Sequence, residues 1–252
     1  MTNILCCVVA LPVEAKPLIS YWGMTKYPKS DCFPTYRTYD ERRWVVISGI
    51  GKLASATALG YLAHLADASR STSWLNWGIA GSKEYTVGQS LIGHKITDVS
   101  LKKSWYPSQI FQGPRLKLCP TAHIQTYDSA TEEYPDKGVV DMESSGFCAG
   151  AMRFSTIELV QSVKVVSDTP TEPISQITKS KVTELMTSNL ATIDEIASQL
   201  LVLGKEISDT EVPPSKYQQF CSQWHFSVTQ AKQLKRLLVQ WSVLLPDVDV
   251  RK

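Results

Sequence analysis

Residues 4–14 read ILCCVVALPVE, and this stretch sets the architecture of the chain. Eight consecutive apolar residues, Ile4–Leu11, are followed by Pro12 and by the acidic Glu14. A short, unbroken apolar run that ends at a turn is typical of a strand buried on both faces of a sheet. The run lacks the basic start and small-residue cleavage site of a secretory signal. We therefore interpret it as a buried first strand.

Alternation of such runs with helical patterns extends along the chain. Between the runs, apolar residues recur at helical spacing over Lys52–Ala68 and Ile177–Leu203, and Gly204 stands where a helix C-cap is expected. This alternation predicts an α/β fold in layers, with a largely parallel or mixed central sheet. The further strand candidates are rich in Val, Ile and Trp: Trp44–Ser48, Trp74–Gly78, Ser90–Ile96 and Val163–Ser167.

Two segments depart from this alternation. Lys102–Thr126 mixes Pro, Gly, Trp and basic residues without a clear period, so we predict a loop with short strands. Asp209–Ser215 contains two adjacent prolines and predicts a connector, after which Ser227 is placed to cap a helix within Tyr217–Leu245. The predicted organisation is an α/β domain over residues 1–208 and a connector with a C-terminal helical extension over residues 209–252.

Composition narrows the class of protein. The 252 residues are 43% hydrophobic, enough for one sizeable core, and the net charge of +2 gives no electrostatic case for a nucleic-acid or membrane partner. No apolar run approaches transmembrane length, and the six scattered cysteines form no C-x-x-C pair. We expect a cytoplasmic protein with reduced cysteines and, because the histidines show no ligand spacing, no metal site.

Acidic residues follow three of the predicted strands. Glu14 follows the first strand, Asp141 and Glu143 follow the apolar Gly138–Val140, and Asp168 follows another strand. Ligands of open α/β sheets gather at the carboxyl ends of strands. Any one of these acids taken alone is explained better as a helix cap or as a partner of the helix dipole. Three such sites in one chain favour a ligand-binding cleft.

Five short motifs follow one another along the chain near the predicted strand ends. They are Ala10-Leu-Pro-Val-Glu14, Ser48-Gly-Ile-Gly-Lys52, Asn76-Trp-Gly-Ile-Ala-Gly81 with Val87-Gly88, Val140-Asp-Met-Glu143 and Val166-Ser-Asp168. In this order they resemble the methylthioadenosine/S-adenosylhomocysteine nucleosidases of the nucleoside phosphorylase superfamily. The resemblance extends from Asn3 to about Leu203 and implies a three-layer fold with a mixed central sheet flanked by helices. It also implies a homodimer that binds a small-molecule nucleoside and needs no organic cofactor or metal.

The resemblance implies a role for each matched residue in breaking the N-glycosidic bond of a purine nucleoside. Asp168, next to Ser167, is implied as the general acid that protonates N7 of the leaving purine. Glu14 is implied as the carboxylate that activates water at the anomeric carbon. Glu143 is implied to accept hydrogen bonds from the ribose hydroxyls, and Met142 to pack against the sugar.

Several positions depart from the family pattern. Asp141 replaces a family Glu and is one methylene shorter, while Ile79 stands in the central loop where the hydrolases often have Ser or Thr. Tyr127 is the candidate for stacking on the base, since Ala130 occupies the place where the family aromatic is expected. Lys164 replaces an Arg and is a candidate to tune Glu14 or to hold water.

Hydrolysis is favoured over phosphorolysis by what the phosphate-binding positions contain. The loop Leu11–Lys16 has neither Arg nor Gly, and Asn76 stands where phosphorylases commonly have Arg. An ionised Glu14 also repels an anion. Gly78-Ile-Ala-Gly81 is similar to futalosine hydrolases and to a phosphorylase-like protein of hopanoid synthesis, so the nucleoside is left open. A purine nucleoside phosphorylase and a non-catalytic nucleoside-binding module remain the alternatives.

Overall fold

The computed structural model describes residues 3–113, 119–210, 216–245 and 248 of the chain. Contacts divide it into two compact units, Met1–Gly204 and Lys205–Lys252. The smaller unit contains α6 (Lys216–Gln223) and α7 (Val228–Leu244), which pack together. Ser227 caps α7 as predicted, because its hydroxyl accepts a hydrogen bond from the amide of Gln230.

One mixed sheet organises the larger unit, and its strands follow the order β10-β6-β8-β9-β5-β1-β4-β3-β2, with β7 beside β6. The central strands β1, β4, β5 and β10 run parallel to one another. β10 pairs with β5 as well as with antiparallel β6, so β5, β9, β8, β6 and β10 close into a ring. The strands are β1 (Leu5–Val9), β2 (Thr25–Lys26), β3 (Thr35–Arg37), β4 (Arg43–Ile47), β5 (Ser73–Ser82), β6 (Ser90–Asp98), β7 (Lys103–Trp105), β8 (Thr121–Thr126), β9 (Val139–Asp141) and β10 (Val160–Asp168).

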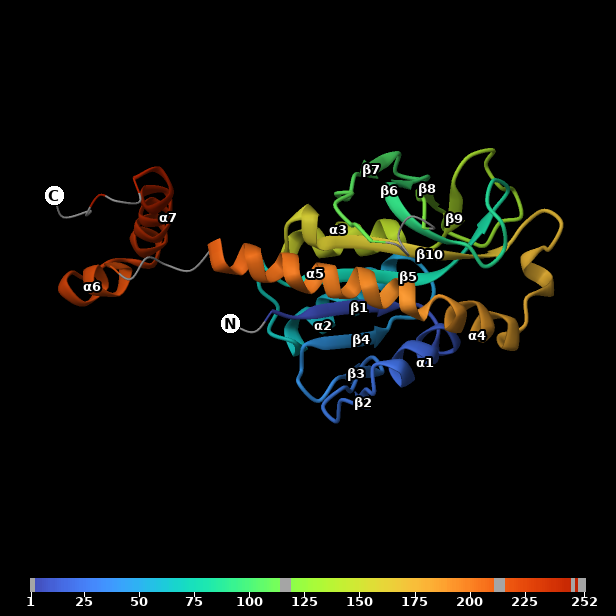
Figure 1. Ribbon diagram of the computed structural model, residues 1–252, viewed down its shortest axis with the longest axis horizontal. Helices are drawn as coiled ribbons and strands as arrows, with labels where there is room; N and C mark the ends of the chain where they lie inside the picture. Colours follow the sequence, from blue (N-terminus) through green and yellow to red (C-terminus); the bar gives the residue numbers. More distant parts are fainter. Residues whose placement is uncertain (1–2, 114–118, 211–215, 246–247, 249–252) are drawn as a thin grey trace. The chain divides into compact units, whose positions relative to one another are not determined.

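Helices cover both faces of this sheet, which makes three layers (Figure 1). In β1, alternate side chains enter two separate hydrophobic cores, since Leu5 and Cys7 face one and Cys6 and Val8 face the other. The first core also contains α1, α4 and α5, and the second contains α2 and α3. The predicted α/β class with a mixed sheet flanked by helices is therefore confirmed. The helices are α1 (Pro12–Tyr21), α2 (Lys52–Leu65), α3 (Ser144–Phe154), α4 (Lys179–Ser188) and α5 (Leu190–Thr210).

The single helix predicted over Ile177–Leu203 is wrong, because the chain breaks at Asn189 between α4 and α5. The Asn189 side chain donates to the carbonyl of Gly88 at 3.1 Å and accepts from the hydroxyl of Ser90 at 2.6 Å. This anchor to the start of β6 interrupts the helix without disturbing its apolar spacing. Long-range partners of this kind leave no mark on local periodicity.

Gly204 lies inside α5, so its predicted role as a C-cap is also wrong. A Cβ atom here would lie 2.6 Å from the side-chain nitrogen Nδ2 of Asn3 and 2.7 Å from the backbone carbonyl oxygen of Ser71. Gly204 therefore permits α5 to approach the start of the sheet closely. The same Asn3 side chain donates to the carbonyl of Leu201 one turn earlier.

The remaining predicted segments have mixed outcomes. Lys102–Thr126 contains the short strands β7 and β8 as predicted, apart from residues 114–118, which lie outside the described residues. Of the predicted connector, Asp209 and Thr210 instead extend α5, and 211–215 lie outside the described residues. Within the described chain, no helix combines the length and apolar character that crossing a membrane requires.

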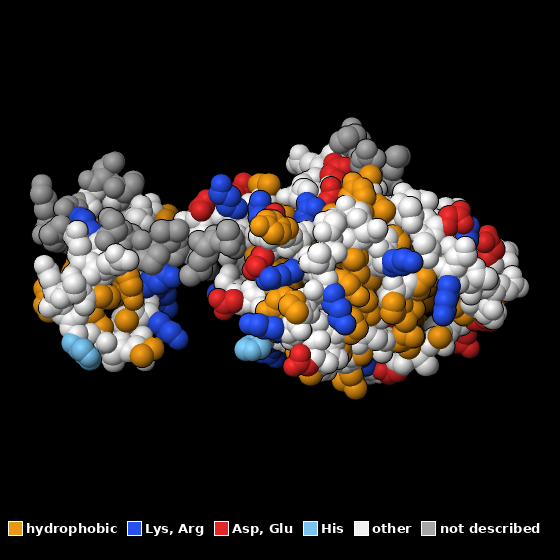
Figure 2. Space-filling view, turned by 90° about the horizontal axis from the view of Figure 1, so that it is seen from below, with side chains coloured by type: hydrophobic (Ala, Val, Ile, Leu, Met, Phe, Trp, Pro, Cys, Tyr) orange, Lys and Arg blue, Asp and Glu red, His pale blue; other side chains and the backbone are white. Residues whose placement is uncertain are grey.

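Basic and acidic side chains are interspersed on the face of the larger unit drawn in Figure 2. Hydrophobic side chains lie between them on the same face (Figure 2). This mixture agrees with the net charge of +2. The face presents no field of one sign of the kind that steers a polyanion.

Two glycine substitutions distinguish the effect of close packing on stability from the effect of helix propensity. Gly204→Ala should lower the free energy of unfolding by about 1–3 kcal/mol, because the new methyl group collides with Asn3 and Ser71. Gly60→Ala is the matched control, since Gly60 lies in α2 and its Cβ would meet nothing within 4 Å. The control should raise stability by up to about 1 kcal/mol. Urea denaturation measures both, and a stabilising Gly204→Ala would contradict the packing argument.

Candidate active site

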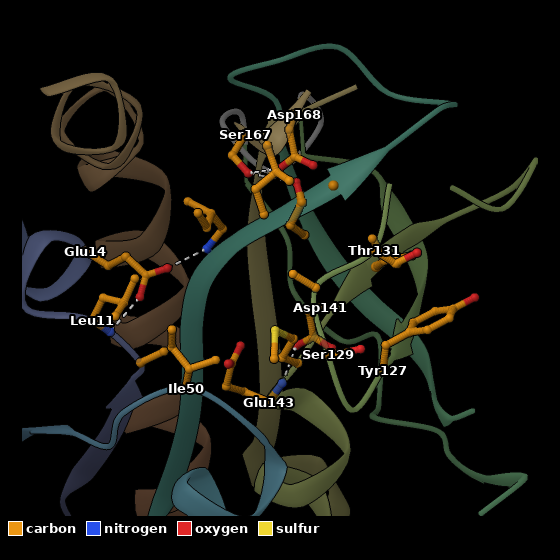
Figure 3. Close-up of a pocket in the computed structure, with 18 residues that line it drawn as sticks. Leu11, Glu14, Ile50, Tyr127, Ser129, Thr131, Asp141, Glu143, Ser167 and Asp168 are labelled. Carbon is orange, nitrogen blue, oxygen red and sulfur yellow. Dashed lines mark hydrogen bonds between the residues drawn. The ribbon is translucent and has the colours of Figure 1, made fainter. Parts of the chain in front are cut away.

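A cavity of about 180 Å³ opens at the carboxyl ends of β1, β9 and β10 (Figure 3). It is the position that the strand-end argument predicted. Side chains from distant parts of the chain meet there, and all eight residues selected from the sequence line the cavity. They are Glu14, Ile79, Tyr127, Asp141, Met142, Glu143, Ser167 and Asp168.

Glu14 lies in the first turn of α1 and is only 2% exposed. Its Oε2 accepts a hydrogen bond from the amide of Leu11 at 2.9 Å, and its Oε1 accepts one from the amide of Ile79 at 3.0 Å. Both bonds are drawn in Figure 3. Burial raises the pKa of Glu14 to about 7, although these two amides and the charge of Lys164 act to lower it. Glu14 is thus a helix-start residue, as the alternative reading held, and also a buried carboxyl group that titrates near neutrality.

Lys164 is the buried cation of the site, in the middle of β10 and 1% exposed. Its Nζ lies 2.8 Å from Oδ2 of Asp141 and 3.8 Å from Oε2 of Glu143. Burial by itself would lower the pKa of Lys164, but these two carboxylates outweigh it and raise the pKa. The side chain therefore stays charged and is directed at the acidic residues that it neutralises.

Asp141 is the direct partner of Lys164 and ends β9. Burial opposes its ionisation, yet the ammonium group and the hydroxyls of Ser144 and Thr126 hold its pKa below the ordinary value. Those hydroxyls lie 2.5 Å and 2.7 Å from the Asp141 carboxylate oxygens. The carboxylate of Asp141, one methylene shorter than Glu, is therefore occupied by the ammonium group of Lys164 and by these two hydroxyls.

Glu143 occupies the N-cap position of α3 and is 7% exposed. Its Oε1 accepts a hydrogen bond from the amide of Gly51 at 2.9 Å. Gly51 has a φ of 101°, a backbone conformation that favours glycine, and it starts α2. Burial raises the pKa of Glu143, while Lys164 acts in the opposite direction. The turn before α2 therefore positions Glu143 at the cavity wall.

Asp168 ends β10, and both of its carboxylate oxygens accept hydrogen bonds from hydroxyl groups. Ser167 Oγ donates to Oδ1 at 2.5 Å, and the Tyr134 hydroxyl donates to Oδ2 at 2.7 Å. The alternative that Asp168 caps a helix is wrong, because Thr169 and Glu172 form a bridged turn directly after it. Asp168 is 2% exposed and directed into the cavity.

The apolar and aromatic candidates differ in how they meet the cavity. Ile79 contributes the backbone amide that holds Glu14, and Met142 lies between Asp141 and Glu143. The ring of Tyr127 points away from Glu14 (Figure 3). Tyr127 therefore lines the cavity at its rim, on the side opposite the Glu14 carboxyl group.

Sequence reasoning missed Tyr134 and the hydroxyl-bearing Ser129 and Thr131, the last two of which line the cavity. All three lie in the segment between β8 and β9, where no periodic pattern marks them. Asn76, singled out as the replacement for a phosphate-binding Arg, is buried instead. Its Oδ1 accepts from the hydroxyls of Ser144 and Ser162, each at 3.1 Å.

The charged side chains that line the cavity are all acidic. Four carboxyl groups line the cavity, and Lys, Arg and His are absent from its described lining. Among the described residues, no three His, Cys, Asp or Glu side chains come together in a way that would hold a metal ion. The arrangement suits a neutral polyol or a group that accepts a proton, and it disfavours an anion.

Comparisons with known proteins find similar solved structures but no similar sequence or sequence family. No protein-family model and no curated protein sequence matches the chain. The 5′-methylthioadenosine nucleosidase of Arabidopsis thaliana matches with a TM-score of 0.65 and 16% identity, over 79% of this chain and 96% of that one. The chain has the fold of these nucleosidases.

Two Helicobacter pylori enzymes extend this comparison. The 5′-methylthioadenosine/S-adenosylhomocysteine nucleosidase, solved with butyl-thio-DADMe-Immucillin-A, matches with a TM-score of 0.63 and 13% identity, over 79% of this chain and 99% of that one. The futalosine hydrolase matches with a TM-score of 0.61 and 13% identity over the same shares. The fold expected from the sequence motifs is confirmed, and the matched share leaves about a fifth of this chain outside the common fold.

The buried ion pair can be tested by removing its cation. Lys164→Met should lower the free energy of unfolding by about 3–5 kcal/mol, because the buried Asp141 carboxylate loses its counter-charge. Lys83→Met is the matched control, since Lys83 pairs with Asp136 at the surface. Chemical denaturation of the three proteins measures the difference. Equal free energies of unfolding for the two variants would show that the Lys164 ion pair does not stabilise the fold.

The buried Glu14 should make stability depend on pH. Its pKa rises from the ordinary 4.5 to about 7, a difference worth about 3 kcal/mol. The folded chain keeps this proton up to about pH 7 and the unfolded chain loses it near 4.5, so this contribution to stability falls as pH rises between these values. Glu14→Gln lacks this titration.

The measurement is urea denaturation of Glu14→Gln and of the wild type at pH 5 and pH 8. The unfolding free energy of Glu14→Gln should gain on that of the wild type by up to about 3 kcal/mol between the two pH values. Glu184→Gln, on the exposed side of α4, serves as the matched control. A constant difference between Glu14→Gln and the wild type would mean that Glu14 is not held in this environment.

Proposed function

We propose that this chain hydrolyses the N-glycosidic bond of a purine nucleoside of the methylthioadenosine or S-adenosylhomocysteine type. The observation that carries the proposal is the convergence of Glu14, Glu143 and Asp168 on one cavity. The first and the last of these residues, Glu14 and Asp168, lie 154 positions apart in the sequence. The fold shared with the nucleosidases supports the same reaction class, as an argument from likeness.

The chemistry assigns one task to each carboxyl group. Asp168 donates a proton to N7 of the purine as the bond between the base and the anomeric carbon breaks, so the base leaves as a neutral molecule. The sugar passes through an oxocarbenium-like state, and Glu143 accepts hydrogen bonds from its hydroxyls. Glu14 takes a proton from the attacking water. Its pKa of about 7 suits that task, because a general base works best when its pKa lies near the working pH.

Water is the proposed nucleophile in place of phosphate. The described lining of the cavity contains four carboxyl groups and lacks a cationic side chain. The nearby Lys164 already pairs with Asp141 at 2.8 Å. An entering phosphate would meet repulsion without a compensating Arg fork or free ammonium group.

The side chains beside Glu14 and Glu143 would surround the substituent at the sugar 5′ position. Leu11 and Ile50 line the cavity there and present aliphatic groups (Figure 3). An aliphatic wall suits a thioether substituent better than a phosphate ester. This favours a methylthioadenosine-like nucleoside, and futalosine is the second candidate because a futalosine hydrolase shares the fold.

Other expectations from the sequence remain proposals. The homodimer is implied by the resemblance, whereas the cytoplasmic location and the division of the chain at residue 208 rest on the sequence pattern itself. A non-catalytic nucleoside sensor is the alternative of a different class. We place it second because Glu14 and Asp168 both line the cavity with their carboxyl groups intact.

Release of free base from a panel of nucleosides tests the proposal directly. The panel contains methylthioadenosine, S-adenosylhomocysteine, adenosine, inosine and futalosine, each with and without phosphate, and chromatography detects the base. We expect phosphate-independent release of adenine. Asp168→Asn should lose at least about 100-fold in turnover, because the proton donor is removed, while urea denaturation shows that it still folds.

Asp136→Asn is the matched control for that variant, since Asp136 is an exposed partner of Lys83. It should keep wild-type turnover. Strict dependence on phosphate would replace hydrolysis by phosphorolysis. Tight nucleoside binding without any turnover would favour the sensor, and undiminished turnover of Asp168→Asn would remove Asp168 from the mechanism.

A further inference from the structure

Tyr134 reaches the candidate acid from a segment that carries none of the sequence motifs. It lies between β8 and β9, in a stretch without helix or strand. Its hydroxyl donates to Oδ2 of Asp168 at 2.7 Å. Ser167 occupies the other oxygen, Oδ1, at 2.5 Å. Two hydroxyl donors therefore fix the orientation of the Asp168 carboxyl group.

Packing against β5 holds the ring of Tyr134 in this place. A Cβ atom at Gly81 would lie 2.5 Å from Cε1 of Tyr134 and 2.5 Å from Oδ2 of Asp168. The ring and the carboxyl group thus share the space that the missing side chain of Gly81 leaves free. Any larger residue at position 81 would displace one of them. The contact depends on this glycine and is built into the strand.

Both ends of the segment that carries Tyr134 are tied to the rest of the domain. Near its start, Asp128 lies 2.7 Å from Nζ of Lys52. At its end, the amide of Gly138 donates to Oε2 of Glu84 at 2.6 Å. These anchors come from α2 and from the turn after β5. The segment is therefore held so that Tyr134 faces Asp168.

The charges around the phenol keep it protonated. Burial, the hydrogen bond to Asp168 and the nearby Glu132 all raise the pKa of Tyr134, and the backbone amide of Ile174 acts against them. The group is a neutral donor throughout the range in which Glu14 titrates. It can give a hydrogen bond to Asp168, but it does not supply the proton itself.

We propose that Tyr134 is a positioning residue that makes Asp168 a more effective proton donor in the hydrolysis. This inference rests on the proposed function of Asp168. When the proton passes from Asp168 to N7 of the base, negative charge develops on the carboxyl oxygens. The bond from the Tyr134 hydroxyl then becomes charge-assisted and stronger. Because it strengthens as the reaction proceeds, it lowers the barrier more than it tightens substrate binding.

Tyr134→Phe removes the hydroxyl and keeps the ring on Gly81. In a nucleosidase assay we expect kcat to fall by about 10- to 100-fold, the range that one charge-assisted hydrogen bond supports, with KM changed only a few-fold. Tyr85→Phe is the matched control, since the Tyr85 hydroxyl donates to the carbonyl of Thr121 at 3.5 Å and not to a carboxyl group of the cavity.

A second measurement separates this inference from the proposed function. In protein labelled with carbon-13 at the Asp side chains, the Asp168 carboxyl resonance is assigned by its loss in Asp168→Asn. Its chemical shift should change in Tyr134→Phe, because the carboxyl group loses a hydrogen bond, and stay in place in Tyr85→Phe. Wild-type protein without turnover would contradict the proposed function, and the Asp168 resonance would then decide on Tyr134 alone. An unmoved resonance, or a Tyr134→Phe variant with wild-type kcat, overturns the inference.

Discussion

The ion pair between Lys164 and Asp141 is the interaction on which the site depends. Four carboxyl groups surround one small cavity, and most are almost fully withdrawn from water. Such a cluster would repel itself or become protonated without a counter-charge. Lys164 supplies that charge from the centre of β10, where it contacts Asp141 directly and Glu143 at longer range. Glu14 accepts hydrogen bonds from the backbone amides of Leu11 and Ile79, and burial raises its pKa to about 7 although the charge of Lys164 acts to lower it.

The sheet explains how these groups reach one place. Parallel β1, β5 and β10 bring Glu14, the amide of Ile79 and Asp168 to the same edge. Antiparallel pairing of β9 with β5 then turns Asp141 and Glu143 toward it. Each acid is held by a neighbour on a different element, so the cavity forms only when the larger unit is folded. Its geometry is a property of the topology and cannot be assembled from one segment.

How much could be foreseen from the sequence depended on whether a feature was local. The long buried strands and α2 were predictable because apolar runs and helical spacing are local features, whereas the short β2 and β3 were not foreseen. The four acids were predictable because they follow apolar runs. The break at Asn189 was not, because its cause is a contact with β6. Gly204 was misjudged because a C-cap and a close helix approach demand the same residue. Tyr134 was missed because its partner lies 34 residues away and its own segment has no period.

The closure of β5, β9, β8, β6 and β10 into a ring also has a consequence for association between folded chains. Unpaired strand edges act as templates for association between chains. In the part of the chain that is described, the ring removes such edges from the long strands and leaves the sheet to end at β2, two residues long, and at β7, three residues long. Strands this short offer few free backbone groups, so the architecture protects a very apolar sheet against edge-to-edge aggregation.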